Sequence, residues 1–165
     1  MSLHGDLIEQ AQHLAKREPN RPRQASLRRA VSTAYYALFH MLINDAAVKL
    51  VPNSPVWLRD QARRAFTHGE MRNACEVFSK SPKAYSHLLI APLETELQSI
   101  ATAFIRLQQI RHAADYDLSQ TFDRSTVLRG IELAKGAMSD WNKVRNTPNS
   151  NVFLAALLLH SRWNR

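Results

Sequence analysis

The chain has 165 residues, of which 45% are hydrophobic, and this length and composition suit one domain with its own core rather than two independent domains. Its 22 Lys and Arg against 14 Asp and Glu give a formal net charge of +8, which favours phosphate-bearing partners but is shared by many proteins that bind none. The single cysteine, Cys75, excludes an internal disulfide and a tetrahedral thiolate metal site. We therefore expect a cytoplasmic protein without a metal or cofactor.

The first half of the chain predicts four helices. A helix over about residues 5–17 ends before a Pro-containing segment, and no Pro or Gly interrupts residues 24–50, which predict one long helix. Ser54 is a candidate N-cap for a third helix that stops at Gly69, and residues 70–79 predict a short fourth helix. The long helix over 24–50 is expected to be the centre of the fold.

The second half predicts a loop followed by three helices. Residues 79–92 mix Pro, Lys, Ser and His with the apolar run 88–90, so we expect a loop that packs this run against the body. Long amphipathic helices are expected over about 93–114 and 125–145, and a final helix over about 151–163. The predicted fold is all-α, an up-and-down helical bundle with additional short helices.

The final helix contains eight consecutive apolar residues, Val152 to Leu159. This run is too short to span a bilayer, so we expect no membrane contact. It is also too apolar for one exposed amphipathic face, so it must be covered by the bundle or by a second copy of the chain. We predict a single domain over residues 1–165 that forms a homodimer.

A polar line runs along the otherwise apolar helix over 24–50. It consists of Arg29, Thr33, Tyr36 and His40. These positions recur at i, i+4, i+7 and i+11 and therefore lie on one helix face. A cationic, phenolic and titratable line is a candidate binding site, and it is equally compatible with a buried polar seam between helices.

Arg111 lies on the apolar stripe of the helix over 93–114, where a guanidinium is costly unless an anion meets it. Asp115, four residues on, is placed to form that ion pair, with Tyr116 filling the gap. This interpretation makes the pair structural. In the functional interpretation Arg111 and His112 face a cleft, where the first holds a phosphate and the second moves a proton.

Arg64 and His68 form a second candidate pair. They are i, i+4 on the predicted third helix and could contact one phosphate together. The alternative is a solvated basic face that includes Arg59 and Arg63.

Two stretches, residues 32–40 (STAYYALFH) and 111–117 (RHAADYD), carry a resemblance to a known family. They are similar to motifs of the HEPN superfamily, whose small helical domains occur in prokaryotic toxin and antitoxin systems, and they lie about where that family has them. The resemblance implies one helical domain, dimerisation, recognition of RNA or a nucleotide, and a partner protein of the nucleotidyltransferase type.

Ribonuclease members of this superfamily use an arginine and a histidine a few residues downstream, without a metal. The RNA 2′-hydroxyl attacks the neighbouring phosphate, histidine acts as acid or base, and arginine stabilises the developing charge. If Arg111 matches that arginine, the expected histidine positions hold Tyr116, Asp117 and Leu118. The catalytic motif is broken, which leaves His112 and His68 as candidates.

These observations predict a HEPN-like module that binds RNA or a nucleotide, associated with toxin–antitoxin systems, with weak or no ribonuclease activity. The predicted binding residues are Arg29, Tyr36, His40, Arg64, Arg111, Asp115 and Tyr116. Two alternatives remain open. One is a structural or protein-interaction helical dimer without a ligand, and the other is a metal-independent endoribonuclease.

Overall fold

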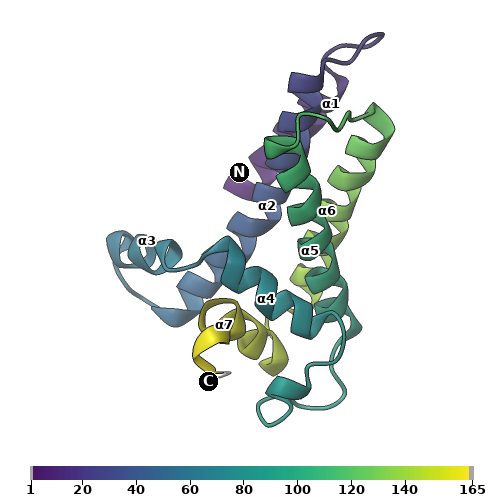
Figure 1. Cartoon of the computed structure of the whole chain (residues 1–165). Coiled ribbons are helices and arrows are strands. Elements are labelled where there is room, and N and C mark those ends of the chain that lie inside the picture. The colour runs from purple at the N-terminus through teal and green to yellow at the C-terminus, as the bar shows by residue number, and fades with distance from the viewer. Residues whose placement is uncertain (1, 164–165) are drawn as a thin grey trace. The chain divides into compact units, whose positions relative to one another are not determined.

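The computed structural model describes residues 2–163, which form seven α-helices, one short 3-10 helix and no strand (Figure 1). The predicted all-α fold is confirmed. In chain order the elements are α1 (Leu3–Lys16), α2 (Gln24–Leu50), α3 (Val56–Arg64), α4 (His68–Phe78), η1 (Lys83–Tyr85), α5 (Thr95–Tyr116), α6 (Arg124–Val144) and α7 (Pro148–Trp163).

The chain divides into two compact units. The first comprises the chain up to His40 together with Ala103–Met138, and the second comprises Met41–Thr102 together with the chain from Ser139 onward. Helices α2, α5 and α6 each contribute residues to both units.

The first unit is a bundle of four helical segments, from α1, α2, α5 and α6, which lie side by side in Figure 1. The inward face of α2 consists of five apolar residues, each at most 1% exposed. These residues are Leu27, Val31, Ala34, Leu38 and Leu42. Their helical spacing places them on one side of α2.

Arg28 fastens the C-terminal end of α5 to α2. Its guanidinium donates to the carbonyl oxygens of Ala114 at 2.8 Å, Asp117 at 3.0 Å and Gln120. It also lies 5.5 Å from the ring centroid of Phe122. The last carbonyls of a helix have no partner within the helix, so Arg28 supplies a donor to one of them, Ala114, and also binds two carbonyls of the segment that follows α5.

Arg124 does the same for α1. It donates to the carbonyl oxygens of Ala15 at 3.0 Å, Pro19 at 2.8 Å and Glu18. One side chain at the start of α6 therefore holds both the end of α1 and the segment that follows it.

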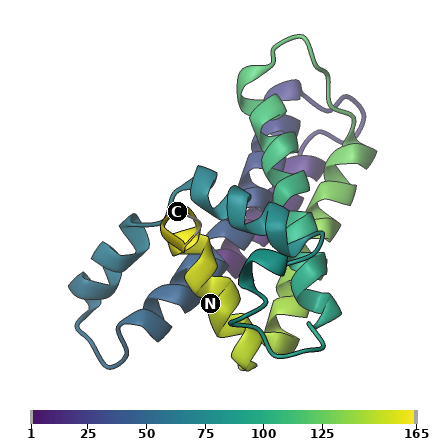
Figure 2. The same ribbon diagram turned by 60° about the horizontal axis from the view of Figure 1, so that its bottom comes forward.

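The second unit has an aromatic core around the packed helices α4 and α7 (Figure 1, Figure 2). Its largest fully buried side chains are Phe78, Tyr85, Trp141 and Phe153. The hydroxyl of Tyr85, at the end of η1, lies 2.5 Å from Nδ1 of His160 on α7. A short helical turn outside the main helices thus contributes an anchor to this core.

The expected packing of residues 88–90 is wrong for two of the three. Leu88 is 41% exposed and Ile90 is 62% exposed, whereas Tyr85 is buried. The segment is attached instead through polar contacts, because the side chain of Asn149 donates to the carbonyl of Ile90 and accepts from its N–H, both at 2.8 Å. The segment is thus held by the buried ring of Tyr85 and the side-chain amide of Asn149, whereas the sequence predicts that the apolar residues 88–90 hold it.

Cys75 lies on the buried face of α4. Burial, with a smaller contribution from the neighbouring Glu76 carboxylate, raises the pKa of the Cys75 thiol far above its ordinary value. The thiol is therefore protonated at neutral pH and is a small apolar side chain of the core rather than a nucleophile.

Helix α7 buries much of its apolar run within one chain. Phe153, Leu154, Ala156 and Leu157 are at most 3% exposed, and α7 packs on α4. A second copy of the chain is not required to cover these residues, so the predicted homodimer loses this part of its support and stays a prediction. No helix within residues 2–163 is both long and apolar enough to cross a membrane.

Candidate functional site

Arg111, on α5 in the first unit, is held by a carboxylate and two aromatic rings. Its Nε donates to Oδ2 of Asp115 at 2.9 Å, and its side chain is only 13% exposed. The guanidinium carbon lies 5.5 Å from the ring centroid of Tyr35 and 5.2 Å from that of Tyr36. The expected ion pair is confirmed, and cation–π contacts with α2 add to it.

Asp115 also connects to α2, because its Oδ1 accepts from the Ser32 hydroxyl at 2.5 Å. Its two oxygens therefore bind one donor from each helix. This arrangement fixes the carboxylate, which in turn fixes the direction of the Arg111 guanidinium.

The two terminal nitrogens of Arg111 have no assigned acceptor within residues 2–163. A guanidinium has five N–H donors, and only the Nε donor is used by Asp115. The remaining donors lie on a side chain that retains some exposure to solvent. Arg111 is consequently both anchored and able to bind an anion.

His40 extends the cluster along α2. Its ring stacks on Tyr36, with centroids 5.9 Å apart and an interplanar angle of 27°, and an edge-on contact with Phe39 covers another side. Burial lowers the pKa of His40 below its ordinary value. The imidazole is therefore neutral at pH 7 and can donate one hydrogen bond and accept another.

The lowered pKa of His40 predicts an acid-dependent loss of stability. Below about pH 6.5, the ordinary pKa of histidine, the unfolded chain binds a proton at His40 that the folded chain resists, so unfolding takes up protons and stability falls with pH. We expect His40→Gln to lose less unfolding free energy than the wild type between pH 7.5 and pH 5.5, measured by urea denaturation. The control is His13→Gln, at an exposed position of α1. Equal losses in wild type and His40→Gln would contradict this assignment.

The remaining residues of the predicted polar line behave differently. Arg29 is exposed, and no partner is assigned to its side chain in the described part of the chain. Thr33 is buried and its hydroxyl donates to the backbone carbonyl of Arg29 at 2.7 Å. Only Tyr36 and His40 of this line therefore belong to the Arg111 cluster.

His112 and Tyr116 lie on the exposed side of α5. Their ring centroids are 5.0 Å apart, and Tyr116 is 66% exposed. Tyr116 thus contacts His112 and does not fill the space beside Arg111, contrary to expectation. His112 therefore lies at the surface, and no carboxylate within residues 2–163 is paired with it.

The predicted pairing of Arg64 and His68 on one helix is wrong. Helix α3 ends at Arg64, and α4 begins at His68 after the N-cap Thr67, whose hydroxyl accepts from the Glu70 N–H at 3.3 Å. Residues 67–70 fit the Thr-x-x-Glu pattern of a capping box, a signal that the sequence carried. Ser54 is likewise not a side-chain N-cap; its carbonyl oxygen accepts from Arg59 instead.

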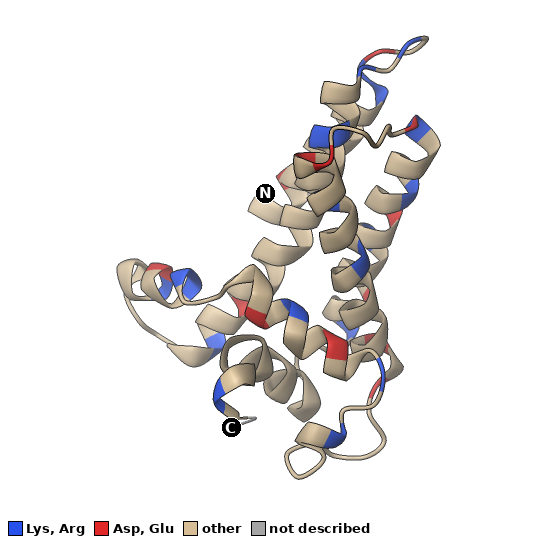
Figure 3. Ribbon diagram, in the orientation of Figure 1, with Lys and Arg blue, Asp and Glu red and all other residues tan. Residues whose placement is uncertain are grey.

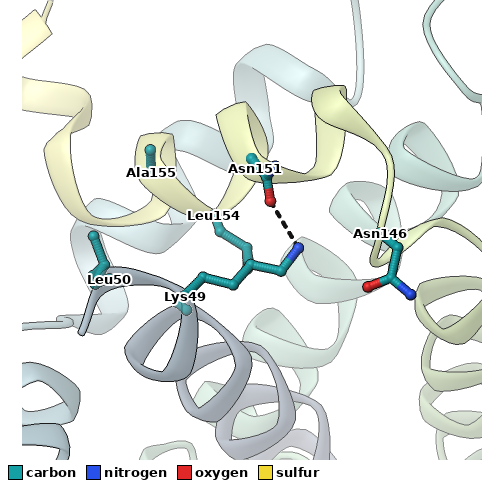
Figure 4. Close-up of a pocket in the computed structure, with 7 residues that line it drawn as sticks. Lys49, Leu50, Asn146, Asn151, Leu154 and Ala155 are labelled. Atoms are coloured by element: carbon teal, nitrogen blue, oxygen red, sulfur yellow. Dashed lines mark hydrogen bonds between the residues drawn. The ribbon is translucent and has the colours of Figure 1, made fainter. Parts of the chain in front are cut away.

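A pocket of about 530 Å³ in the second unit was not predicted (Figure 4). It lies between the end of α2 and the start of α7, and its lining residues are Ala46, Lys49, Leu50, Asn146, Asn151, Leu154 and Ala155. Figure 4 shows the Lys49 side chain extended toward Asn151, whose Oδ1 accepts at 2.7 Å.

Lys49 is firmly bound in this pocket. Its amine also donates to the carbonyl of Arg145 and lies 3.5 Å from the Ser150 hydroxyl. Burial lowers the pKa of Lys49, the Asp45 carboxylate opposes this shift, and the Arg145 charge adds to it. Because three acceptors surround the amine, Lys49 joins α2 to α7 and has little capacity left for a ligand.

No group of three or more His, Cys, Asp or Glu side chains within residues 2–163 is arranged to hold a metal ion. Comparison of the chain with protein-family models, with curated proteins and with solved structures found no match.

Proposed function

We propose that this chain is a HEPN-like helical module that binds RNA or a nucleotide, with weak or no ribonuclease activity. The observation that carries the proposal is the state of Arg111, whose Nε is held by Asp115 while its terminal nitrogens have no acceptor within residues 2–163. A guanidinium oriented in this way presents a planar pair of donors that suits two phosphate oxygens.

The surroundings of Arg111 support an anionic ligand. Tyr36 packs under the guanidinium, so the side chain loses little conformational entropy on binding. His40, neutral and stacked on Tyr36, adds a hydrogen-bonding group that is suited to a sugar hydroxyl or a phosphate oxygen. The net charge of +8 favours the approach of nucleic acid from a distance. Basic residues are spread over several helices rather than gathered in a tail (Figure 3).

Catalysis receives less support than binding. Tyr116, Asp117 and Leu118 occupy the positions where the resemblance places a histidine, and the His112 ring packs against Tyr116 at the surface. The activity expected in the presence of EDTA is therefore weak or absent. RNA cleavage that His112→Ala or His68→Ala abolishes would favour the endoribonuclease interpretation instead.

The alternative function, a structural or protein-interaction helical module, is favoured by one observation. Asp115 already compensates the charge of Arg111 and also binds Ser32, so the cluster holds α2 to α5 without any ligand. A nucleotidyltransferase-type partner and a toxin–antitoxin role belong to the resemblance and stay predictions.

The test is RNA binding by Arg111→Lys and Arg111→Met, measured by fluorescence anisotropy with a labelled single-stranded RNA. Lysine keeps the charge but loses the planar donor pair, and we expect about ten-fold weaker binding. Methionine removes the charge and should also reduce the salt dependence of binding by about one phosphate contact. Circular dichroism shows whether each variant is folded.

Lys135→Met is the matched control, because it removes one exposed positive charge from α6 that pairs with Glu132 at 2.9 Å. We expect its RNA affinity to stay within about two-fold of wild type. Folded Arg111→Lys with unchanged RNA affinity would overturn the role of Arg111, and wild type that binds no RNA would overturn RNA as the ligand.

A further inference from the structure

A groove of about 350 Å³ lies between α5 and α6 in the first unit. Its lining residues are Arg106 and Ile110 from α5 and Thr126, Arg129, Gly130 and Leu133 from α6. The α5 pair is spaced i, i+4, and the α6 residues are spaced i, i+3, i+4 and i+7, so each set forms one helix face. The volume is that of a small-ligand site.

Two guanidinium groups share this groove. The side chain of Arg106 is exposed and has no assigned partner within residues 2–163. Arg129 donates to the hydroxyls of Thr126 at 2.9 Å and Ser125 at 3.3 Å. Both of these acceptors are uncharged, so they orient Arg129 without neutralising it.

The acidic group associated with Arg129 is Asp123, which already caps the start of α6. Its oxygens accept from the Thr126 N–H at 2.8 Å and from the Ser125 hydroxyl at 2.5 Å. These hydrogen bonds, with a smaller effect of the Arg129 charge, hold the pKa of Asp123 well below its ordinary value. The groove therefore carries the guanidinium groups of Arg106 and Arg129, whereas the nearby Asp123 carboxylate is already hydrogen-bonded at the start of α6. The groove has an excess of positive charge.

Gly130 leaves the floor of the groove open. It is a buried residue, yet a Cβ added to it would meet no atom within 4 Å. The space over Gly130 therefore belongs to the groove and is not filled by neighbouring side chains. Ile110 and Leu133, both half-buried, supply apolar surface beside it.

We propose that this groove binds a small organic phosphate, with the phosphate between Arg106 and Arg129 and the organic part over Gly130, Ile110 and Leu133. Guanidinium groups suit phosphate oxygens, and the apolar walls favour a ligand with a compact hydrophobic body. The proposal is independent of RNA or nucleotide binding at Arg111, because that side chain contacts the tyrosines of α2 and does not line the groove.

Phenyl phosphate is the probe, titrated against ¹⁵N-labelled protein at constant ionic strength and compared with inorganic phosphate. We expect saturable shifts of the Thr126 and Gly130 amides, and tighter binding of phenyl phosphate than of inorganic phosphate because of the apolar walls. Arg106→Gln and Arg129→Gln should each weaken binding about ten-fold. Lys135→Gln, which removes a charge from α6 outside the groove, should change the affinity less than about two-fold.

A matched pair of glycine substitutions tests the location. Gly130→Leu places a side chain in the groove, and Gly136→Leu makes the same change on the same helix, where a Cβ also meets nothing within 4 Å. We expect Gly130→Leu to abolish phenyl phosphate binding and Gly136→Leu to preserve it, with both variants folded. If the Gly130 variant does not fold, the two arginine variants decide.

The absence of saturable shifts, equal affinities for phenyl phosphate and inorganic phosphate, or full binding by Gly130→Leu would each overturn the proposal. The affinity for phenyl phosphate should be the same in wild type and in folded Arg111→Met. The RNA anisotropy measurement therefore tests binding at Arg111, and the phenyl phosphate titration tests the groove, so the failure of one proposal can be distinguished from the failure of the other.

Discussion

Trp141→Ala is expected to lower the free energy of unfolding by about 3–5 kcal/mol, a large part of the roughly 5–15 kcal/mol that stabilises a typical domain. Trp141 is fully buried in the second unit, and its ring centroid lies 6.2 Å from that of Phe153. Truncation removes this packing and leaves a cavity that neighbouring helices can fill only in part.

The substitution also removes a buried hydrogen-bond donor. Nε1 of Trp141 donates to Oδ2 of Asp45 at 2.6 Å, and the same carboxylate accepts from Arg145 at 2.9 Å. Trp141→Phe keeps much of the apolar volume but leaves Asp45 with one donor fewer, so we expect a loss of about 1–3 kcal/mol. The difference between the two variants separates packing from hydrogen bonding.

Urea denaturation followed by circular dichroism measures both variants. Trp57→Ala is the matched control, because Trp57 is 67% exposed on α3 and its removal should change stability by about 0.5 kcal/mol or less. Similar stability losses for Trp141→Ala and Trp57→Ala would show that the aromatic core of the second unit is assigned wrongly.

Arg28→Met is expected to destabilise the first unit by about 2–4 kcal/mol. The variant keeps an apolar side chain of similar length but removes the donors for three carbonyl oxygens. A hydrogen bond to a charged group contributes roughly 1.5–3 kcal/mol net, and only the bond to Ala114 is part-buried, so the two exposed bonds to Asp117 and Gln120 contribute less. Ala114 belongs to the last turn of α5, so hydrogen exchange at the end of this helix should accelerate along with the global loss of stability.

The adjacent arginine provides the control. Arg29 differs from Arg28 by one position on α2, is exposed, and has no assigned side-chain partner within residues 2–163. Arg29→Met should therefore change the free energy of unfolding by about 0.5 kcal/mol or less. Equal effects of the two substitutions would refute the role of Arg28 at the end of α5.

Local sequence signals predicted much of the helical fold. The bounds of α2 agree with the prediction because no Pro or Gly interrupts residues 24–50, and its buried face follows from helical periodicity. The Arg111–Asp115 ion pair was also predictable, since both residues lie one turn apart on α5. Each of these features depends on residues that are close in sequence.

Features that depend on distant backbone groups were missed. Arg28 and Arg124 bind carbonyl oxygens that are between 86 and 109 positions away. Every residue has a backbone carbonyl, so the residue type does not show which carbonyl will accept a hydrogen bond. The pocket at Lys49 was missed for the same reason, because α2 and α7 meet there from opposite ends of the sequence. The break between α3 and α4 is different, because the sequence does carry its capping signal, Thr67 with Glu70, although the prediction ends the third helix at Gly69.

The division of α2, α5 and α6 between the two units determines how ligand sites can be mapped experimentally. Neither unit is a continuous stretch of chain. The chain passes from one unit to the other at three points, and each of these points lies inside a helix. No continuous fragment of the chain contains one complete unit without part of the other. Binding must therefore be assigned by single-residue substitution in the intact polypeptide, since a truncated fragment that loses binding would report only a loss of folding.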